Sequence, residues 1–358
     1  MHHPTIHMNF NDLSKYRPFL YGFSTLWILL FHCGTQVPSE GILLPFSYFQ
    51  SFGNCGVEIF LLLSGFGLYH SMEMDPNIGT FYKKRLLRVF LPAFLAMSAF
   101  NIVKGGTLLE YIGSSTFVGY WFGIETVWYV AFILTMYLFY PFVYTLQKKS
   151  TRNAVILFLL SLLFSFFSET FHVVDKEIQR GISRIPAFLL GCLIAPSVIS
   201  KKQVSRWTLP VSFCSAMFTA LLWKVMEKYG YYYFFRSLAY IVFSILAIAG
   251  LCMLARILVK YKPLHGIYQW IAFCGGISLE VYLIFERTLE LLGRLPGFSA
   301  HPCGGLKLDI AAAILTLFLA VVLQTTTKNI IKSVNSCPVP ESSHNHMQSE
   351  HKNQPLSE

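Results

Sequence analysis

Two ionisable side chains lie near the ends of long apolar runs in the first part of the chain. His32 follows the apolar residues 27–31, and Glu58 lies within the mostly apolar residues 56–63. Ionisable groups in such runs are costly, so each one calls for an explanation. An imidazole can remove a proton from a hydroxyl near neutral pH, and a carboxylate at a similar depth can orient it. His32 is therefore a candidate general base with Glu58 as its partner, unless each merely reaches the polar edge of its run.

A basic cluster precedes the third apolar run. Arg85 and Arg88 are three residues apart and therefore share one face of a helix. Two guanidiniums on one face suit phosphate groups, and Lys84 beside them adds a further positive charge. The alternative is that this short basic segment only fixes the orientation of the neighbouring helices. Arg85, Arg88 and Lys84 are thus candidate phosphate-binding residues.

The composition places these residues in a membrane protein. The 358 residues are 54% hydrophobic, 16% aromatic and 13% charged, whereas a soluble domain carries about 25% charged residues. The apolar residues form continuous blocks, near the roughly 20 residues that cross a bilayer as a helix. Because a backbone in lipid must satisfy its own hydrogen bonds, the predicted fold is all-α, a polytopic membrane helix bundle with about ten transmembrane helices. The predicted spans are residues 18–36, 55–72, 87–104, 124–146, 153–172, 184–200, 208–226, 234–257, 268–292 and 308–328.

Lysine and arginine gather in short clusters between these spans. With ten spans the clusters all fall on one side, which predicts that both termini are cytoplasmic. The same distribution accounts for the net charge of +10 without nucleic acid as a partner. The predicted organisation is a cytoplasmic N-terminal segment at residues 1–16, a transmembrane domain at 17–332 and a polar, disordered cytoplasmic tail at 333–358. The eight cysteines show no metal-ligand spacing, so neither a metal nor a permanently bound cofactor is expected.

Four segments carry a resemblance to a known family. In their order and spacing the chain resembles the acyltransferase 3 family of bacterial membrane acyltransferases over about residues 16–330, and weaker similarities lie at 184–191 and 278–283. The family typically O-acetylates surface polysaccharides and glycolipids. The four segments are Leu30-Phe31-His32; Gly56-Val57-Glu58-Ile59-Phe60 running into Leu63-Ser64-Gly65-Phe66; Phe81-Tyr82-Lys83-Lys84-Arg85-Leu86-Leu87-Arg88 with Pro92; and Trp128-Tyr129 with Tyr137 and Pro141.

The resemblance implies a multi-pass O-acyltransferase of the bacterial cytoplasmic (inner) membrane, in contact with membrane lipid. Its donor would be acetyl-CoA or another acyl-CoA, made in the cytoplasm, and its acceptor a hydroxyl of a glycan or glycolipid. His32 would act as general base with Glu58 orienting it, while Arg85 and Arg88 hold the phosphates of CoA. Since His32 lies roughly 20 Å along a helix from Arg17, the pantetheine arm would have to reach inward.

Further residues are candidates for lining the substrate path. Ser64, together with Gly65, equally suits a close approach of two helices. The candidates are Arg17, Ser64, Trp128, Tyr137, Glu280 and Tyr282.

Three positions depart from the family pattern. Tyr21 stands where a basic residue is usual, Ile133 where an acid is usual, and Phe285, with Glu286 beside it, where a histidine is usual. These departures leave open a catalytically inactive member of the family. A glycan or lipid transporter or flippase is another alternative, for which Gly- or Pro-broken spans in both halves would be expected. The sequence shows no such pair.

Overall fold

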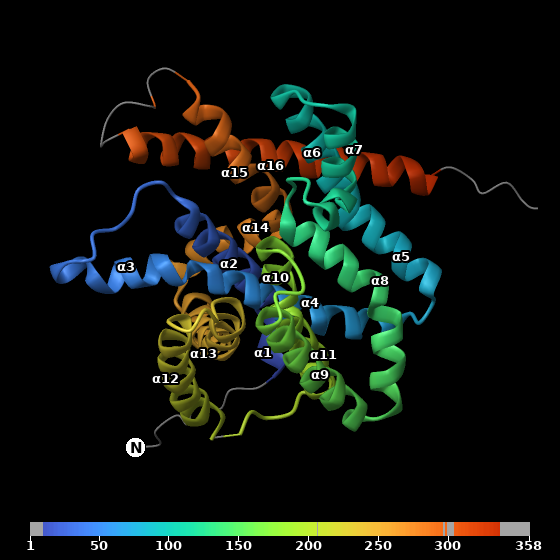
Figure 1. The fold of residues 1–358 in the computed structure, drawn as a ribbon, viewed down its shortest axis with the longest axis vertical. Helices are drawn as coiled ribbons and strands as arrows, with labels where there is room; N and C mark the ends of the chain where they lie inside the picture. The colour runs from blue at the N-terminus through green and yellow to red at the C-terminus, as the bar shows by residue number, and fades with distance from the viewer. Residues whose placement is uncertain (1–9, 206, 296–297, 299–303, 337–358) are drawn as a thin grey trace, which may run out of the picture.

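The computed structural model describes residues 10–205, 207–295, 298 and 304–336, and the regular elements in these ranges are helices (Figure 1). The all-α prediction is therefore confirmed. A π-helical turn, Leu86–Phe90, joins α5 to α6. The α-helices are α1 Asn11–Lys15, α2 Arg17–His32, α3 Leu44–Ser51, α4 Cys55–Met74, α5 Ile78–Arg85, α6 Leu91–Lys104, α7 Leu108–Thr116, α8 Trp128–Lys149, α9 Thr151–Thr170, α10 Lys176–Ile182, α11 Ile185–Ile199, α12 Thr208–Glu227, α13 Tyr233–Lys260, α14 His265–Gly276, α15 Ser278–Gly293 and α16 Gly304–Ser336.

Each of the ten predicted spans coincides with a helical stretch. Eight stretches of the described residues are long and apolar enough to cross a membrane, and the pair α14–α15, bent by 77°, supplies a ninth. The remaining predicted span, residues 18–36, corresponds to α2, which has only 16 residues and is shorter than the usual length of about 20. Residues 333–336 of the predicted tail are helical, because α16 continues to Ser336; the rest of the predicted tail lies outside the described residues.

The centre of the bundle is α4, whose side chains are largely buried from Cys55 to Met72. It packs against α2 and α11. At the contact with α11, a Cβ atom on Gly191 would lie 2.1 Å from the carbonyl oxygen of Leu62, and one on Gly65 would lie 2.2 Å from that of Phe188. Only glycine permits this approach, so the predicted role of Gly65 in close helix packing is confirmed.

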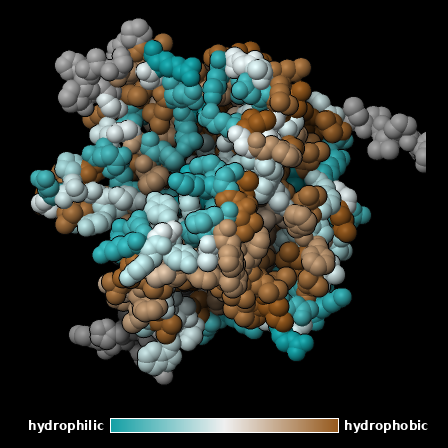
Figure 2. Space-filling model, viewed as in Figure 1, coloured by the Kyte–Doolittle hydropathy of each residue, from teal (hydrophilic) through white to brown (hydrophobic). Residues whose placement is uncertain are grey.

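The periphery is apolar, as expected of helices that face lipid. On α12, large side chains such as Phe213, Met217 and Leu221 are 60–65% exposed. Figure 2 shows apolar residues over α8 and α9 on one face, while hydrophilic residues gather near its centre, over α10. Ionisable groups are therefore concentrated where several helix ends meet rather than along the lipid-facing surface.

Candidate active site

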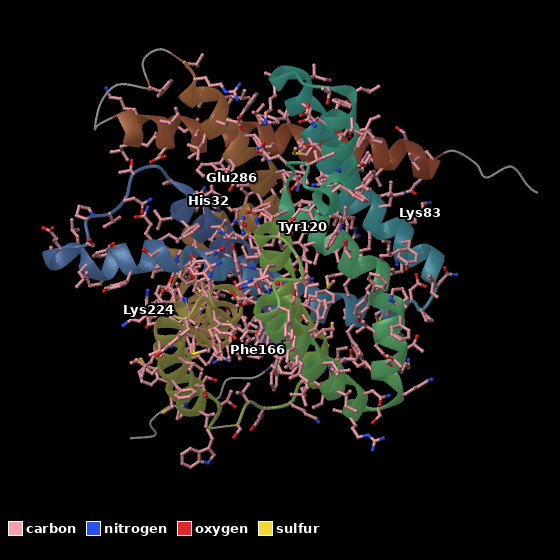
Figure 3. The ribbon with its side chains drawn as sticks, in the orientation of Figure 1. His32, Lys83, Tyr120, Phe166, Lys224 and Glu286 are labelled. Atoms are coloured by element: carbon pink, nitrogen blue, oxygen red, sulfur yellow. The ribbon has the colours of Figure 1, made fainter. Side chains whose placement is uncertain are left out.

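A cavity of about 700 Å³ lies where the end of α2 and the start of α8 meet α10 and the middle of α15. His32 is the last residue of α2, and Trp128 is the first residue of α8. Both line the cavity together with Arg180 of α10 and Glu286 of α15. We call it the His32 cavity. Figure 3 shows His32 and Glu286 side by side near the middle of the bundle, with Tyr120 close by.

The partner of His32 is Glu286. Its Oε1 lies 3.0 Å from Nδ1 of His32, and the two side chains are 33% and 49% exposed. A carboxylate that accepts a hydrogen bond from Nδ1–H leaves Nε2 as the proton-accepting nitrogen of the neutral ring. It also stabilises the imidazolium that forms when the ring takes up a proton. His32 therefore has the arrangement of an oriented general base that opens into a cavity.

The structure corrects the predicted pairing of His32 with Glu58. Glu58 is fully buried and meets Nη1 of Arg184 at 3.1 Å, while Nη2 of Arg184 donates to Oδ1 of Asn54 at 3.2 Å. The Arg184 guanidinium also lies 5.1 Å from the ring of Trp128. Matched depth along two helices did not imply contact, because Glu58 faces α11 rather than the end of α2. This buried pair joins α4 to α11 beneath the His32 cavity.

A second cavity, of about 310 Å³, lies deeper in the bundle. Arg85 and Arg88 both line it, so the prediction that they share a face is confirmed. Arg85 directly precedes a π-helical turn and Arg88 lies within it; this distortion is frequent at functional sites. Ser64, Tyr137 and Tyr282, three of the candidates for lining a substrate path, line the same cavity. We call it the arginine cavity.

Arg17 completes the positive charge beside this cavity. Its Nη2 donates to the hydroxyl of Tyr21 at 3.3 Å and to the carbonyl of Leu63 at 3.4 Å. A Cβ on Gly67 would lie 2.2 Å from that nitrogen, so glycine is required for Arg17 to cross α4. Tyr21 itself lines the cavity. The guanidinium that the family pattern places at residue 21 is thus supplied from one turn earlier in the helix.

The guanidiniums here lack carboxylate partners. Among the described residues, Arg17, Arg85 and Arg88 form no ion pair. The buried Nε atoms of Arg17 and Arg85 have no hydrogen-bond partner in the same part of the chain. Arg17 and Arg85 are half-buried, whereas Arg88 is exposed. Partial burial of a cation without a counter-charge is costly, and a bound anion would offset that cost. This cluster is therefore suited to an anionic group such as a phosphate.

Two predicted site residues lie elsewhere. Lys84 pairs with Asp75 at 3.1 Å and lines neither cavity. Its ammonium holds the pKa of the Asp75 carboxyl below its ordinary value. Glu280 is buried on α15 but also lines neither cavity. The positive charge of the arginine cavity therefore comes from arginines alone.

Neighbouring residues of the same helices line the two cavities. On α15, Tyr282 lines the arginine cavity and Glu286, one turn later, lines the His32 cavity. On α8 the corresponding neighbours are Tyr129 and Trp128. The rings of Tyr129 and Tyr282 meet edge to face, with their centroids 5.3 Å apart. On α15, this pair of aromatic rings lies about one helical turn from the residue that lines the His32 cavity.

Glu286 and Arg184 were not among the predicted site residues, although the sequence holds a weak signal for each. Glu286 follows Tyr282 by four residues and so shares its helix face. Arg184 opens the weakly similar segment 184–191, at the end of a predicted span. Arg184 is an ionisable group at the start of a predicted span and Glu286 is one within a predicted span, and for such groups a functional or pairing role is the default expectation. Their partners could not be read from spacing, because those lie far away along the chain.

Comparison with known proteins agrees with the sequence resemblance. The model of the acyltransferase 3 family, described as an acyltransferase domain, matches residues 20–325. This range contains His32, Glu286 and all the residues of the arginine cavity. No curated protein and no solved structure matches the chain significantly.

Proposed function

The chain belongs to the acyltransferase 3 family, and we propose that it transfers an acyl group from cytoplasmic acyl-CoA to a hydroxyl of a cell-surface or exported glycan. Acetyl is the acyl group that we expect. One observation carries the proposal. An oriented imidazole opens into one cavity and a cluster of guanidiniums without ion-pair partners among the described residues opens into another, and neighbouring residues of α8 and α15 line the two. A base for an acceptor and an anion site for a donor are the two parts that such a transfer needs.

The arginine cavity suits the donor. CoA carries a pyrophosphate and a further phosphate, and Arg85, Arg88 and Arg17 offer guanidinium donors without competing carboxylates. The predicted topology puts these arginines on the cytoplasmic side, where acyl-CoA is made. The pantetheine arm would then extend past Ser64 and Tyr137 toward the ring pair of Tyr129 and Tyr282.

The His32 cavity suits the acceptor. Nε2 of His32 removes the proton of the acceptor hydroxyl, and the oxygen attacks the thioester carbonyl. The carbon–sulfur bond breaks, the acyl group stays on the acceptor oxygen, and the CoA thiolate leaves and takes up the proton. Glu286 stabilises the imidazolium between these steps. For the thioester to meet the hydroxyl, the Tyr129 and Tyr282 rings have to turn aside.

The bent pair α14–α15 is the observation that favours a second candidate function, a glycan or lipid transporter. Broken spans with ionisable groups at the break are typical of transporters. Among the described residues this is the only pair bent in this way, whereas inverted-repeat transporters break corresponding spans in both halves. A glycan or lipid transporter would move its substrate without consuming acyl-CoA, so release of free CoA separates the two functions.

Replacing the proposed base tests the function. In cells that carry His32→Asn, mass spectrometry of surface glycans should find one acyl mass missing, as in cells that lack the gene, with protein abundance unchanged. His70→Asn is the matched control, because His70 is exposed on α4 and lines neither cavity. The wild-type purified protein should release CoA from acetyl-CoA when the unacylated glycan is added. Full acylation by His32→Asn would refute the assignment.

A further inference from the structure

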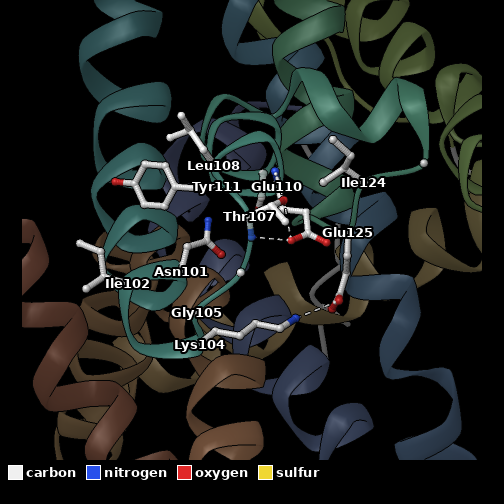
Figure 4. Close-up of a pocket in the computed structure, with 13 residues that line it drawn as sticks. Asn101, Ile102, Lys104, Gly105, Thr107, Leu108, Glu110, Tyr111, Ile124 and Glu125 are labelled. Carbon is white, nitrogen blue, oxygen red and sulfur yellow. Dashed lines mark hydrogen bonds and ion pairs between the residues drawn. The ribbon is translucent and has the colours of Figure 1, made fainter.

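A third cavity, of about 620 Å³, lies beside the His32 cavity. It is enclosed by the end of α6, the Gly105–Gly106 turn, α7 and the loop before α8. Figure 4 shows Asn101, Leu108 and Tyr111 on one side of this space and Ile124 with Glu125 on the other. We call it the Tyr111 cavity. None of its residues has a part in the acyl transfer described above.

The Tyr111 and His32 cavities adjoin each other. Gly123, Ile124 and Glu125 line both of them. Glu125 pairs with Lys104 of the Tyr111 cavity at 3.1 Å and with Arg287 of the His32 cavity at 3.3 Å. Arg287 follows Glu286, the partner of His32. One molecule that extends over the ridge at Glu125 therefore reaches both cavities.

The Tyr111 cavity offers neutral hydrogen-bonding groups. Its charged side chains are already engaged: Lys104 with Glu125, and Glu110 with the backbone nitrogen and hydroxyl of Thr107. Hydrogen bonding from Lys104 holds the pKa of the Glu125 carboxyl below its ordinary value, so this carboxylate stays ionised at neutral pH. The groups left for a ligand are the side-chain oxygen of Asn101, whose amide nitrogen donates to Ser115 at 3.1 Å, the Tyr111 ring and hydroxyl, and glycine backbone. Such a set suits a hydroxyl-rich, uncharged molecule rather than an anion.

The volumes bear on the length of the ligand. Each of the two cavities, at 700 Å³ and 620 Å³, falls in the range of about 300–1,000 Å³ that holds a whole drug-sized ligand. A single sugar ring is smaller than either cavity. A monosaccharide at His32 would leave the Tyr111 cavity empty, whereas a chain of sugars would occupy both.

We propose that the Tyr111 cavity is a second acceptor subsite, which binds an uncharged sugar next to the one that is acylated at His32. The acceptor is accordingly a glycan of at least two or three sugars rather than a free monosaccharide. This inference rests on the proposed function, since it needs an acceptor at His32.

The test compares acceptors of different length. Unacylated surface glycan from cells that lack the gene is partly hydrolysed and separated into fragments of one, two, three and four sugars. Purified protein with acetyl-CoA should use the three-sugar fragment with a kcat/KM at least about tenfold above that of the one-sugar fragment, because two or more additional hydrogen bonds form. Leu108→Trp, which fills part of the Tyr111 cavity, should lower this ratio about tenfold.

Leu109→Trp is the matched control. Leu108 and Leu109 are neighbours on α7 and are 74% and 73% exposed, but only Leu108 lines the cavity. Leu109→Trp should leave the ratio unchanged. Equal use of one-sugar and three-sugar fragments by the wild type, or equal effects of the two tryptophans, would overturn the subsite. If the wild type fails to acylate even the intact glycan, the proposed function fails, and the subsite falls with it.

Discussion

Replacing Glu286 tests the chemistry of the His32 cavity most directly. Glu286→Gln keeps the shape and the hydrogen-bond acceptor but removes the negative charge 3.0 Å from the imidazole. In the proposed reaction, His32 is neutral when the acceptor binds and positive when the proton is transferred. The carboxylate therefore stabilises the transition state more than the ground state, and its loss should lower kcat.

The solvent exposure of His32 and Glu286 determines how much the loss of the charge should lower kcat. Two unit charges 3.0 Å apart attract each other by about 1.4 kcal/mol in water and about 5.5 kcal/mol at an effective dielectric constant of about 20. His32 is 33% and Glu286 49% exposed, so solvent screening holds the value between these limits. A contribution of about 2–3 kcal/mol corresponds to a loss of about 30- to 160-fold in kcat.

The assay is release of CoA thiol by purified protein with acetyl-CoA and unacylated glycan. Glu290→Gln is the control, because Glu290 lies one turn further along α15 and pairs with Arg287 and Arg294 instead of His32. The double variant with His32→Asn should be no slower than His32→Asn alone, since both changes remove one proton relay. A loss below threefold in Glu286→Gln, or fully multiplicative effects in the double variant, would refute this reasoning.

Two further predictions separate structural from binding roles. Glu58→Gln leaves the buried guanidinium of Arg184 without its counter-charge and should lower the free energy of unfolding by about 3–5 kcal/mol. The measurement is the unfolding temperature in detergent, which should fall. An unchanged unfolding temperature with lost activity would instead favour a catalytic role for Glu58. Arg85→Gln should raise the KM for acetyl-CoA about 10- to 100-fold, because a charge-assisted contact to phosphate is lost. Lys84→Gln should change that KM less than about twofold, because Lys84 pairs with Asp75 at the surface; equal effects of the two changes would contradict the arginine cavity as the donor site.

Two of the three departures from the family pattern, Tyr21 and Phe285, have a physical explanation in the structure. Tyr21 replaces a basic residue, but Arg17 places its guanidinium on the Tyr21 hydroxyl. Phe285 replaces a histidine, but the next residue, Glu286, contacts His32. A neighbouring residue thus supplies an ionisable group near each position. These two departures therefore give little support to an inactive protein.

The local sequence pattern was sufficient to predict the fold class and some residues of the candidate site. Runs of apolar residues long enough to cross a bilayer predict the helices whatever their neighbours, because a backbone in lipid has to bond to itself. The three-residue spacing of Arg85 and Arg88 predicts a shared face, because that relation exists within one helix. His32 could be found as an ionisable group at the end of an apolar run.

Contacts between helices were decided only by the tertiary structure. Sequence pattern paired His32 with Glu58 by depth, but the packing of the helices puts Glu286, from near the other end of the chain, against His32, and Arg184 against Glu58. Depth follows from counting residues along one helix, whereas rotation about the helix axis depends on packing, such as the glycine contact between α4 and α11. The cavities share this origin, because each is the space left between side chains of several helices.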